Sequence, residues 1–171
     1  KKRKQFFKSI AGYLILILIC LISFILSPFV SLILFITVSS YHFGEQHFEN
    51  KIRCNGFVKS SIFLLYGIVI FSMIFIENMR DVDRIVQDLT NGYFSEQIIS
   101  LILFASLLAL ILLFVYVFYQ KQAIQINWVK EVFYLVVLYL VFKTTSLILG
   151  FAIYFIFWHS IPSIIDQTKF L

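Results

Sequence analysis

The sequence predicts an all-α protein, a polytopic transmembrane helix bundle of about six spans. Of its 171 residues, 61% are hydrophobic and only 13% are charged, and the mean hydropathy is +0.95, whereas a water-soluble domain carries roughly 25% charged residues. Long apolar runs recur along the chain with short polar segments between them. Several such runs in one small chain leave too little polar surface to cover them, so we expect the chain to lie in lipid.

The six spans follow from the lengths of the apolar stretches. Residues 10–38 would form a helix of about 43 Å, which is too long for one crossing of a hydrocarbon core about 30 Å thick. Pro28 offers a break, because proline suits the first turn of a helix. The last stretch, 129–165, is also too long, and residues 143–146 interrupt it. The predicted spans are 9–26, 28–43, 57–76, 95–119, 128–142 and 145–165, in a single membrane domain over residues 1–171.

The basic residues give the orientation of this six-span bundle. If the N-terminus lies in the cytoplasm, most of the 14 Lys and Arg residues fall on the inner side, as in known membrane proteins. The inner ones are Lys1, Lys2, Arg3, Lys4, Lys8, Lys51, Arg53, Lys59, Lys121, Lys130 and Lys169, and the outer ones are Arg80, Arg84 and Lys143. We therefore expect a multi-pass protein of the cell membrane. A four-span topology with both long stretches unbroken and strongly tilted is the alternative.

Other features describe topology rather than chemistry. The net charge of +5 does not indicate a nucleic-acid partner, because the basic residues flank apolar segments. Residues 77–97 form the longest outer segment, in which we expect a short amphipathic helix at about residues 82–89. Cys20 lies in an apolar run and Cys54 in a polar loop, so we expect inert thiols and no disulfide between them. The chain begins at Lys1 rather than Met, and we expect it to be a fragment or a trimmed product.

The three histidines are the residues best suited to chemistry, and all lie on the predicted cytoplasmic side. His42 and His47 lie where the second span ends, and His159 lies in the last span. Ionisable residues in membrane segments tend to mark function, and imidazole is a common metal ligand; an isolated histidine at a helix end is also often a hydrogen-bonded structural residue. In an unbroken helix His42 and His47 point about 140° apart and cannot bind one ion. Gly44 could end the helix and redirect His47.

Two segments resemble signature motifs of a known family. Residues 40–45, SYHFGE, and residues 151–160, FAIYFIFWHS, are similar to two segments of the Brp/Blh family, the bacterial and archaeal β-carotene 15,15′-dioxygenases. Glu131 also fits the pattern of that family. The resemblance implies a membrane-embedded, iron-dependent enzyme that uses dioxygen to split β-carotene centrally into two molecules of retinal. It also implies membrane lipid as the surroundings and a functional link to a rhodopsin.

The resemblance also implies roles for individual residues. His42 and His159 are the predicted ligands of ferrous iron, Fe(2+), and His47 is a weaker candidate. Glu45 would orient an imidazole through its distal N–H, and Ser163 would lie beside the metal ligands. No catalytic residue is predicted beyond these.

A hydrocarbon substrate has no polar group to hold, so its binding site is expected to be an apolar tunnel open to lipid. Tyr41, Tyr154 and Trp158 are the predicted residues of this tunnel near the metal. For each of them, packing in the helix bundle is an equally good explanation.

The chain departs from the family pattern at three points. Ser163 stands where family members carry a second histidine, and His47 replaces a usual acidic residue. A His-Gly motif with a following Asp has no counterpart and would precede Lys1. The missing histidine at Ser163 favours an alternative, a non-catalytic membrane protein that binds carotenoid or serves in assembly or transport. A third hypothesis is a haem protein with His42 and His159 as axial ligands.

Overall fold

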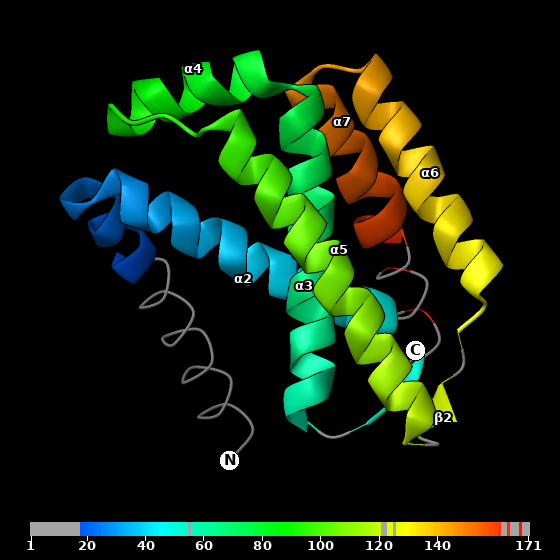
Figure 1. Cartoon of the computed structure of the whole chain (residues 1–171). Helices are drawn as coiled ribbons and strands as arrows, with labels where there is room; N and C mark the ends of the chain where they lie inside the picture. Colours follow the sequence, from blue (N-terminus) through cyan, green and yellow to red (C-terminus); the bar gives the residue numbers. More distant parts are fainter. Residues whose placement is uncertain are drawn as a thin grey trace.

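The computed structural model describes residues 18–54, 56–120, 123–124, 126–161, 164 and 168, and this part of the chain is mostly helical. The elements are α2 (Pro28–Phe48), β1 (Ile52–Arg53), α3 (Gly56–Glu77), α4 (Met79–Thr90), α5 (Glu96–Tyr119), β2 (Ala123–Ile124), α6 (Trp128–Thr144), α7 (Leu147–Tyr154) and the π-helix η1 (Phe155–Ser160). Helix α3 stands at the centre and contacts α2, α4, α5, α6 and α7 (Figure 1). The two short strands pair antiparallel, so the expectation of a purely α-helical chain needs this one correction.

The helix breaks lie where the sequence predicts them. Ser27 is not helical, with φ −153° and ψ 85°, and α2 begins at Pro28. Helix α6 ends at Thr144, and Thr145 is extended before α7 begins. The expected amphipathic helix is also confirmed as α4, which is somewhat longer than predicted. Local sequence signals therefore set these boundaries correctly.

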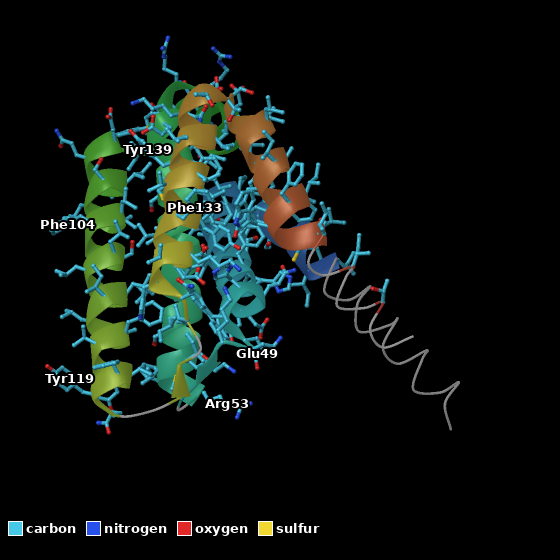
Figure 2. All side chains as sticks on the ribbon, turned by 90° about the vertical axis from the view of Figure 1, so that its right-hand side faces the viewer. Glu49, Arg53, Phe104, Tyr119, Phe133 and Tyr139 are labelled. Carbon is cyan, nitrogen blue, oxygen red and sulfur yellow. The ribbon has the colours of Figure 1, made fainter. Side chains whose placement is uncertain are left out.

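Two described helices, α3 and α5, are long and apolar enough to cross a membrane. Half of the apolar segment of α3 is buried inside the protein, but only 22% of that of α5. Leu101, Phe104 and Phe118 of α5 are exposed, and Figure 2 shows Phe104 pointing outward. The predicted count of about six spans is not confirmed, and residues 9–17 of the first predicted span lie outside the described residues.

Helix α2 runs across α3 rather than alongside it (Figures 1 and 2). Two glycines allow this crossing to be very close. A Cβ atom at Gly44 would lie 1.9 Å from the carbonyl oxygen of Phe63, and a Cβ atom at Gly67 would lie 1.9 Å from the carbonyl oxygen of Ser40. Each helix thus contributes a glycine that faces the backbone of the other, a mode of packing that small residues permit.

Gly44 does not end the helix, because α2 continues to Phe48. The alternative in which this glycine redirects His47 is therefore wrong. Its lack of a side chain serves the close approach of α3 instead.

Both cysteines are free, as expected. Burial raises the pKa of the Cys54 thiol, and the positive charge of Lys59 opposes this rise only in part. Because the thiolate is the reactive form, a raised pKa leaves little of it at neutral pH. Cys54 is accordingly expected to be a poor nucleophile.

The glycine crossing predicts a clear difference between two glycines of α3. Gly67→Ala places a methyl group against the backbone of Ser40, which cannot yield without separating the helices, so we expect a loss of stability of about 3 kcal/mol or more. Thermal unfolding of the detergent-purified protein measures this loss.

Gly56→Ala is the control, since a Cβ atom there meets nothing within 4 Å. We expect it to leave the unfolding temperature nearly unchanged. Equal effects of the two substitutions would contradict the close crossing.

Candidate functional site

A buried polar cluster joins α2 to the first turn of α6. It consists of His47 in the last turn of α2, Lys51 just after α2, Glu131 of α6 and Tyr66 of α3. The Nε2 atom of His47 lies 2.5 Å from Oε2 of Glu131, and Nζ of Lys51 lies 2.8 Å from Oε1 of the same carboxylate. The side chains of His47 and Glu131 are only 13% and 12% exposed, so this is a largely dehydrated group of charges.

The donor and acceptor roles in the cluster follow from the chemistry of Glu131. An ionised carboxylate only accepts hydrogen bonds, so the short contact requires a proton on Nε2 of His47. Lys51 donates to the second carboxylate oxygen. The ammonium of Lys51 also lies 3.1 Å from Nε2 of His47, so two donors meet beside one acceptor group. The carboxylate thus holds the imidazole and the ammonium together.

Aromatic side chains surround His47. The ring of Tyr66 stacks on the imidazole with centroids 4.8 Å apart and an angle of 13° between the planes. Phe48 and Tyr134 present their edges to the same ring. These contacts, with the hydrogen bond to Glu131, fix the orientation of the imidazole.

The hydroxyl of Tyr66 is buried and has no hydrogen-bond partner among the residues that the structure describes. It lies within electrostatic reach of Glu131, Tyr134 and Tyr154. A buried hydroxyl without a partner costs about 1–3 kcal/mol. Such a group is typically satisfied by water or a ligand, which marks this part of the cluster as a candidate binding position.

His42 lies on a different face of α2 from His47. Its side chain is 57% exposed, and its Nδ1 atom lies 3.6 Å from Oε2 of Glu45 one turn further along. A carboxylate behind an imidazole is a common arrangement for a metal-binding histidine, because it orients the ring. This geometry suits the predicted role of Glu45 but does not bring His42 and His47 together.

The third histidine lies in the π-helix η1. Turns of π-helix are rare and occur frequently at functional sites. The side chain of His159 and the whole of Ser163 lie outside the described residues. The distance between the imidazoles of His42 and His159 therefore remains a prediction. Within the described residues, no three His, Cys, Asp or Glu side chains form a metal-binding group.

The predicted tunnel residues lie in different surroundings. Tyr154 is buried, packs edge-on against Phe43 with centroids 5.0 Å apart, and lines a narrow gap in the core. Trp158 packs edge-on against Tyr134, close to the polar cluster. Tyr41 packs against Phe63 on α3. Tyr154 and Trp158 are thus near the cluster.

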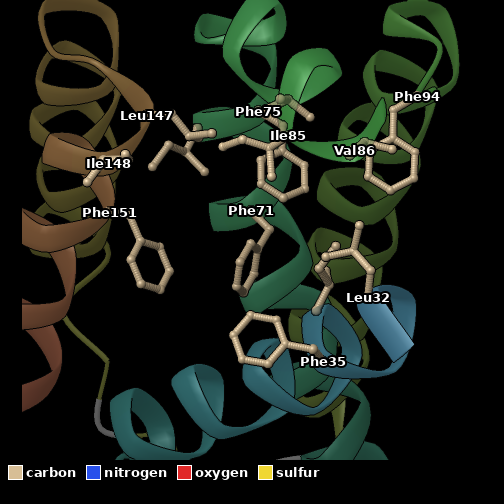
Figure 3. Close-up of a pocket in the computed structure, with 13 residues that line it drawn as sticks. Leu32, Phe35, Phe71, Phe75, Ile85, Val86, Phe94, Leu147, Ile148 and Phe151 are labelled. Carbon is tan, nitrogen blue, oxygen red and sulfur yellow. The ribbon is translucent and has the colours of Figure 1, made fainter. Parts of the chain in front are cut away.

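Two larger apolar cavities lie beside α2 and α3. The first, which we name the α4 chamber, has a volume of about 270 Å³ (Figure 3). Its lining residues come from α2, α3, α4, α7 and the segment before α5: Leu32, Phe35, Ile36, Phe71, Ile74, Phe75, Val82, Ile85, Val86, Phe94, Leu147, Ile148 and Phe151. None of them has a polar side chain, so the chamber suits a hydrocarbon.

The second cavity, the α5 chamber, has a volume of about 390 Å³ and lies between α2, α3 and α5. It shares the side chains of Ile36, Phe71, Phe75 and Phe94 with the α4 chamber. Phe71 also borders the narrow gap beside Tyr154. The buried ring of Phe71 thus lines three neighbouring apolar spaces.

Sequence reasoning missed two members of the polar cluster, Lys51 and Tyr66. Lys51 follows His47 by four residues, a spacing that could have indicated a shared helical face. Nothing in the sequence distinguishes Tyr66 from the other eight tyrosines. Glu131 fits the family pattern, but its pairing with His47 is visible only in the folded chain.

The profile of one family, described as "BCD: Beta-carotene 15,15′-dioxygenase", matches residues 1–171. Comparison with the curated proteins gave no match, and neither did comparison with the solved structures.

The polar cluster predicts that Glu131 is important for stability. Glu131→Ala would leave the ammonium of Lys51 and the imidazole of His47 without their acceptor in a dehydrated site, at a cost of about 3 kcal/mol. Thermal unfolding of the purified protein should show this loss.

Glu49→Ala is the matched control, because it breaks the pair between Lys59 and Glu49, whose carboxylate is exposed. Exposed pairs contribute at most about 1 kcal/mol, so we expect little change. A loss for Glu131→Ala no larger than that of the control would contradict a tightly coupled cluster.

Proposed function

This chain belongs to the beta-carotene 15,15′-dioxygenase family, and from that membership we propose that it cleaves β-carotene at its central double bond to give retinal. The observation that carries the proposal is the family match over the whole chain. The apolar chambers support a hydrocarbon substrate, since their linings are almost entirely aliphatic and aromatic. The retinal formed would supply a rhodopsin.

We further propose that the enzyme is a multi-pass protein of the cell membrane. Helices α3 and α5 have the required length and composition, and the exposed apolar side chains of α5 suit contact with lipid tails. The bias of Lys and Arg residues supports a cytoplasmic N-terminus and histidines on that side. β-Carotene dissolves in the same hydrocarbon layer, so it can reach the chambers without passing through water.

Ferrous iron is the proposed cofactor, held by His42 and His159, with His47 as a weaker candidate. The described residues fit it in part. Oε2 of Glu45 lies 3.6 Å from Nδ1 of His42. The buried hydroxyl of Tyr66, which has no hydrogen-bond partner among the described residues, belongs to the ring that stacks on His47, the weaker candidate. Bound ferrous iron would supply a place where dioxygen binds and is activated.

The overall reaction constrains what the protein side chains must do. One carbon–carbon double bond breaks, two carbonyl bonds form, and each retinal molecule takes one atom of dioxygen. No proton is gained or lost in this balance. The cluster of His47, Lys51 and Glu131 is therefore not required as a net proton donor or acceptor, and we assign it the task of holding α2 and α6 in fixed register.

A non-catalytic role in binding carotenoid is the second candidate. The feature that favours it is Ser163, which stands where the family pattern has a histidine. Such a protein would retain β-carotene intact in air, whereas the enzyme would convert it.

Expression in bacteria that accumulate β-carotene tests the enzyme directly. We expect the cells to lose their colour and to produce retinal, and His42→Ala or His159→Ala to abolish the product. Glu49→Ala, which changes an exposed side chain, should retain activity. Coloured cells that contain confirmed full-length protein and no retinal would refute the proposed reaction.

Iron dependence has a separate readout. The purified protein should bind ferrous iron, and Glu45→Gln should weaken the binding about tenfold, because it removes the carboxylate behind His42. Metal analysis after dialysis against defined iron concentrations measures this. Unchanged iron binding in both His42→Ala and His159→Ala would exclude these residues as the ligands.

A further inference from the structure

The α4 chamber differs from the α5 chamber in its lining. All of its side chains are aliphatic or aromatic hydrocarbons, whereas the α5 chamber also contains Ser72, Tyr93 and Ser95. An enclosed cavity of about 150 Å³ lined by Leu, Ile and Phe can bind a benzene molecule. The α4 chamber is a larger and partly open pocket, in which the lining side chains of Phe35 and Ile148 are exposed. The α4 chamber, at about 270 Å³, is therefore large enough for a methylated six-membered ring.

Helix α4 covers this chamber. Val82 and Val86 are buried and face the cavity, while Arg80, Arg84 and Asp88 belong to the polar remainder of the helix. Ile85 completes the contribution of α4, and Phe35, Phe71 and Phe151 surround the space beneath it (Figure 3). An apolar group in the chamber would thus be shielded from the polar surface above.

The chamber also lies at a defined distance from His42. Phe35 precedes His42 by seven residues on the unbroken helix α2, so both project within about 20° of each other, and the helix rises about 10 Å between them. Leu32 lines the chamber about 15 Å from His42 along the same axis. Val38, exposed between Phe35 and His42, continues an apolar path from the chamber to the imidazole.

We propose that the α4 chamber binds one cyclic end of the carotenoid and thereby sets which double bond lies beside His42. This inference rests on the proposed function, because it assumes a carotenoid substrate. A ring held at the chamber and a polyene lying along α2 place a bond near the middle of the molecule at the histidine. Leu32, Phe35, Ile85 and Ile148 are then residues that determine specificity rather than reactivity.

Carotenoid retention without oxygen tests the chamber independently of cleavage. The purified wild-type protein is loaded anaerobically with β-carotene or with the acyclic lycopene, and the retained pigment is measured by absorbance. Ile148→Trp and Ile85→Trp enlarge two side chains that line the chamber from different helices, both at exposed positions, Ile148 at 75% and Ile85 at 38%. We expect each to lower β-carotene retention about tenfold and lycopene retention much less.

Two neighbouring positions provide the controls. Leu149→Trp on α7 and Leu89→Trp on α4 add the same ring to exposed leucines that do not line the chamber. Both should retain β-carotene like the wild type. Equal effects at positions 148 and 149, equal losses of both pigments, or no retention by the wild type would each overturn the inference.

The same samples separate this inference from the proposed function. Wild-type protein that retains β-carotene, discriminates as expected and yields no retinal in air would leave the chamber assignment intact and refute the cleavage. Wild-type protein that yields retinal, together with Ile148→Trp and Ile85→Trp variants that retain β-carotene normally, would support the cleavage and refute the chamber assignment.

Discussion

The close crossing of α2 and α3 is the constraint on which the rest of the structure depends. Gly44 and Gly67 each face a carbonyl of the opposite helix, so the two backbones meet without intervening side chains. This contact brings the last turn of α2 against the middle of α3, where His47 stacks on Tyr66. The same crossing sets the position of the earlier turns of α2, which form the floor of the α4 chamber. The polar cluster and the apolar cavities therefore share one structural origin.

The polar cluster shows how an otherwise apolar chain accommodates charge. A single buried carboxylate or ammonium would be expensive in a medium of low dielectric constant. Glu131 accepts hydrogen bonds from both His47 and Lys51, which pairs the carboxylate with an ammonium and uses both of its oxygens. Because these residues lie about 80 positions apart in the chain, the cluster also fixes α6 relative to α2. A bond of this kind favours one arrangement of helices over others that apolar packing alone would permit.

The arrangement separates the polar and apolar parts of the proposed reaction. The chambers contain no charged side chain, and the cluster of His47, Lys51 and Glu131 lies at the C-terminal end of α2, beyond the residues of α2 that line the chambers. His42 lies between these regions, on the face of α2 that leads to the α4 chamber. A hydrocarbon can thus be held by apolar contact alone while polar groups act at one point along its length, as a cleavage at a single double bond requires.

The sequence by itself determined the helical class, the breaks at Pro28 and after Thr144, the amphipathic α4 and the family membership. These features depend on local backbone preference, on hydrophobic periodicity or on contiguous motifs, and each of these can be read from a short stretch of the sequence. Only the tertiary structure decided that Gly44 serves a crossing, that Glu131 pairs with His47 and that Phe71 lines three apolar spaces. Such relations depend on the rotation and register of one helix against another. Those are set by the packing of many side chains together, and no local pattern specifies them.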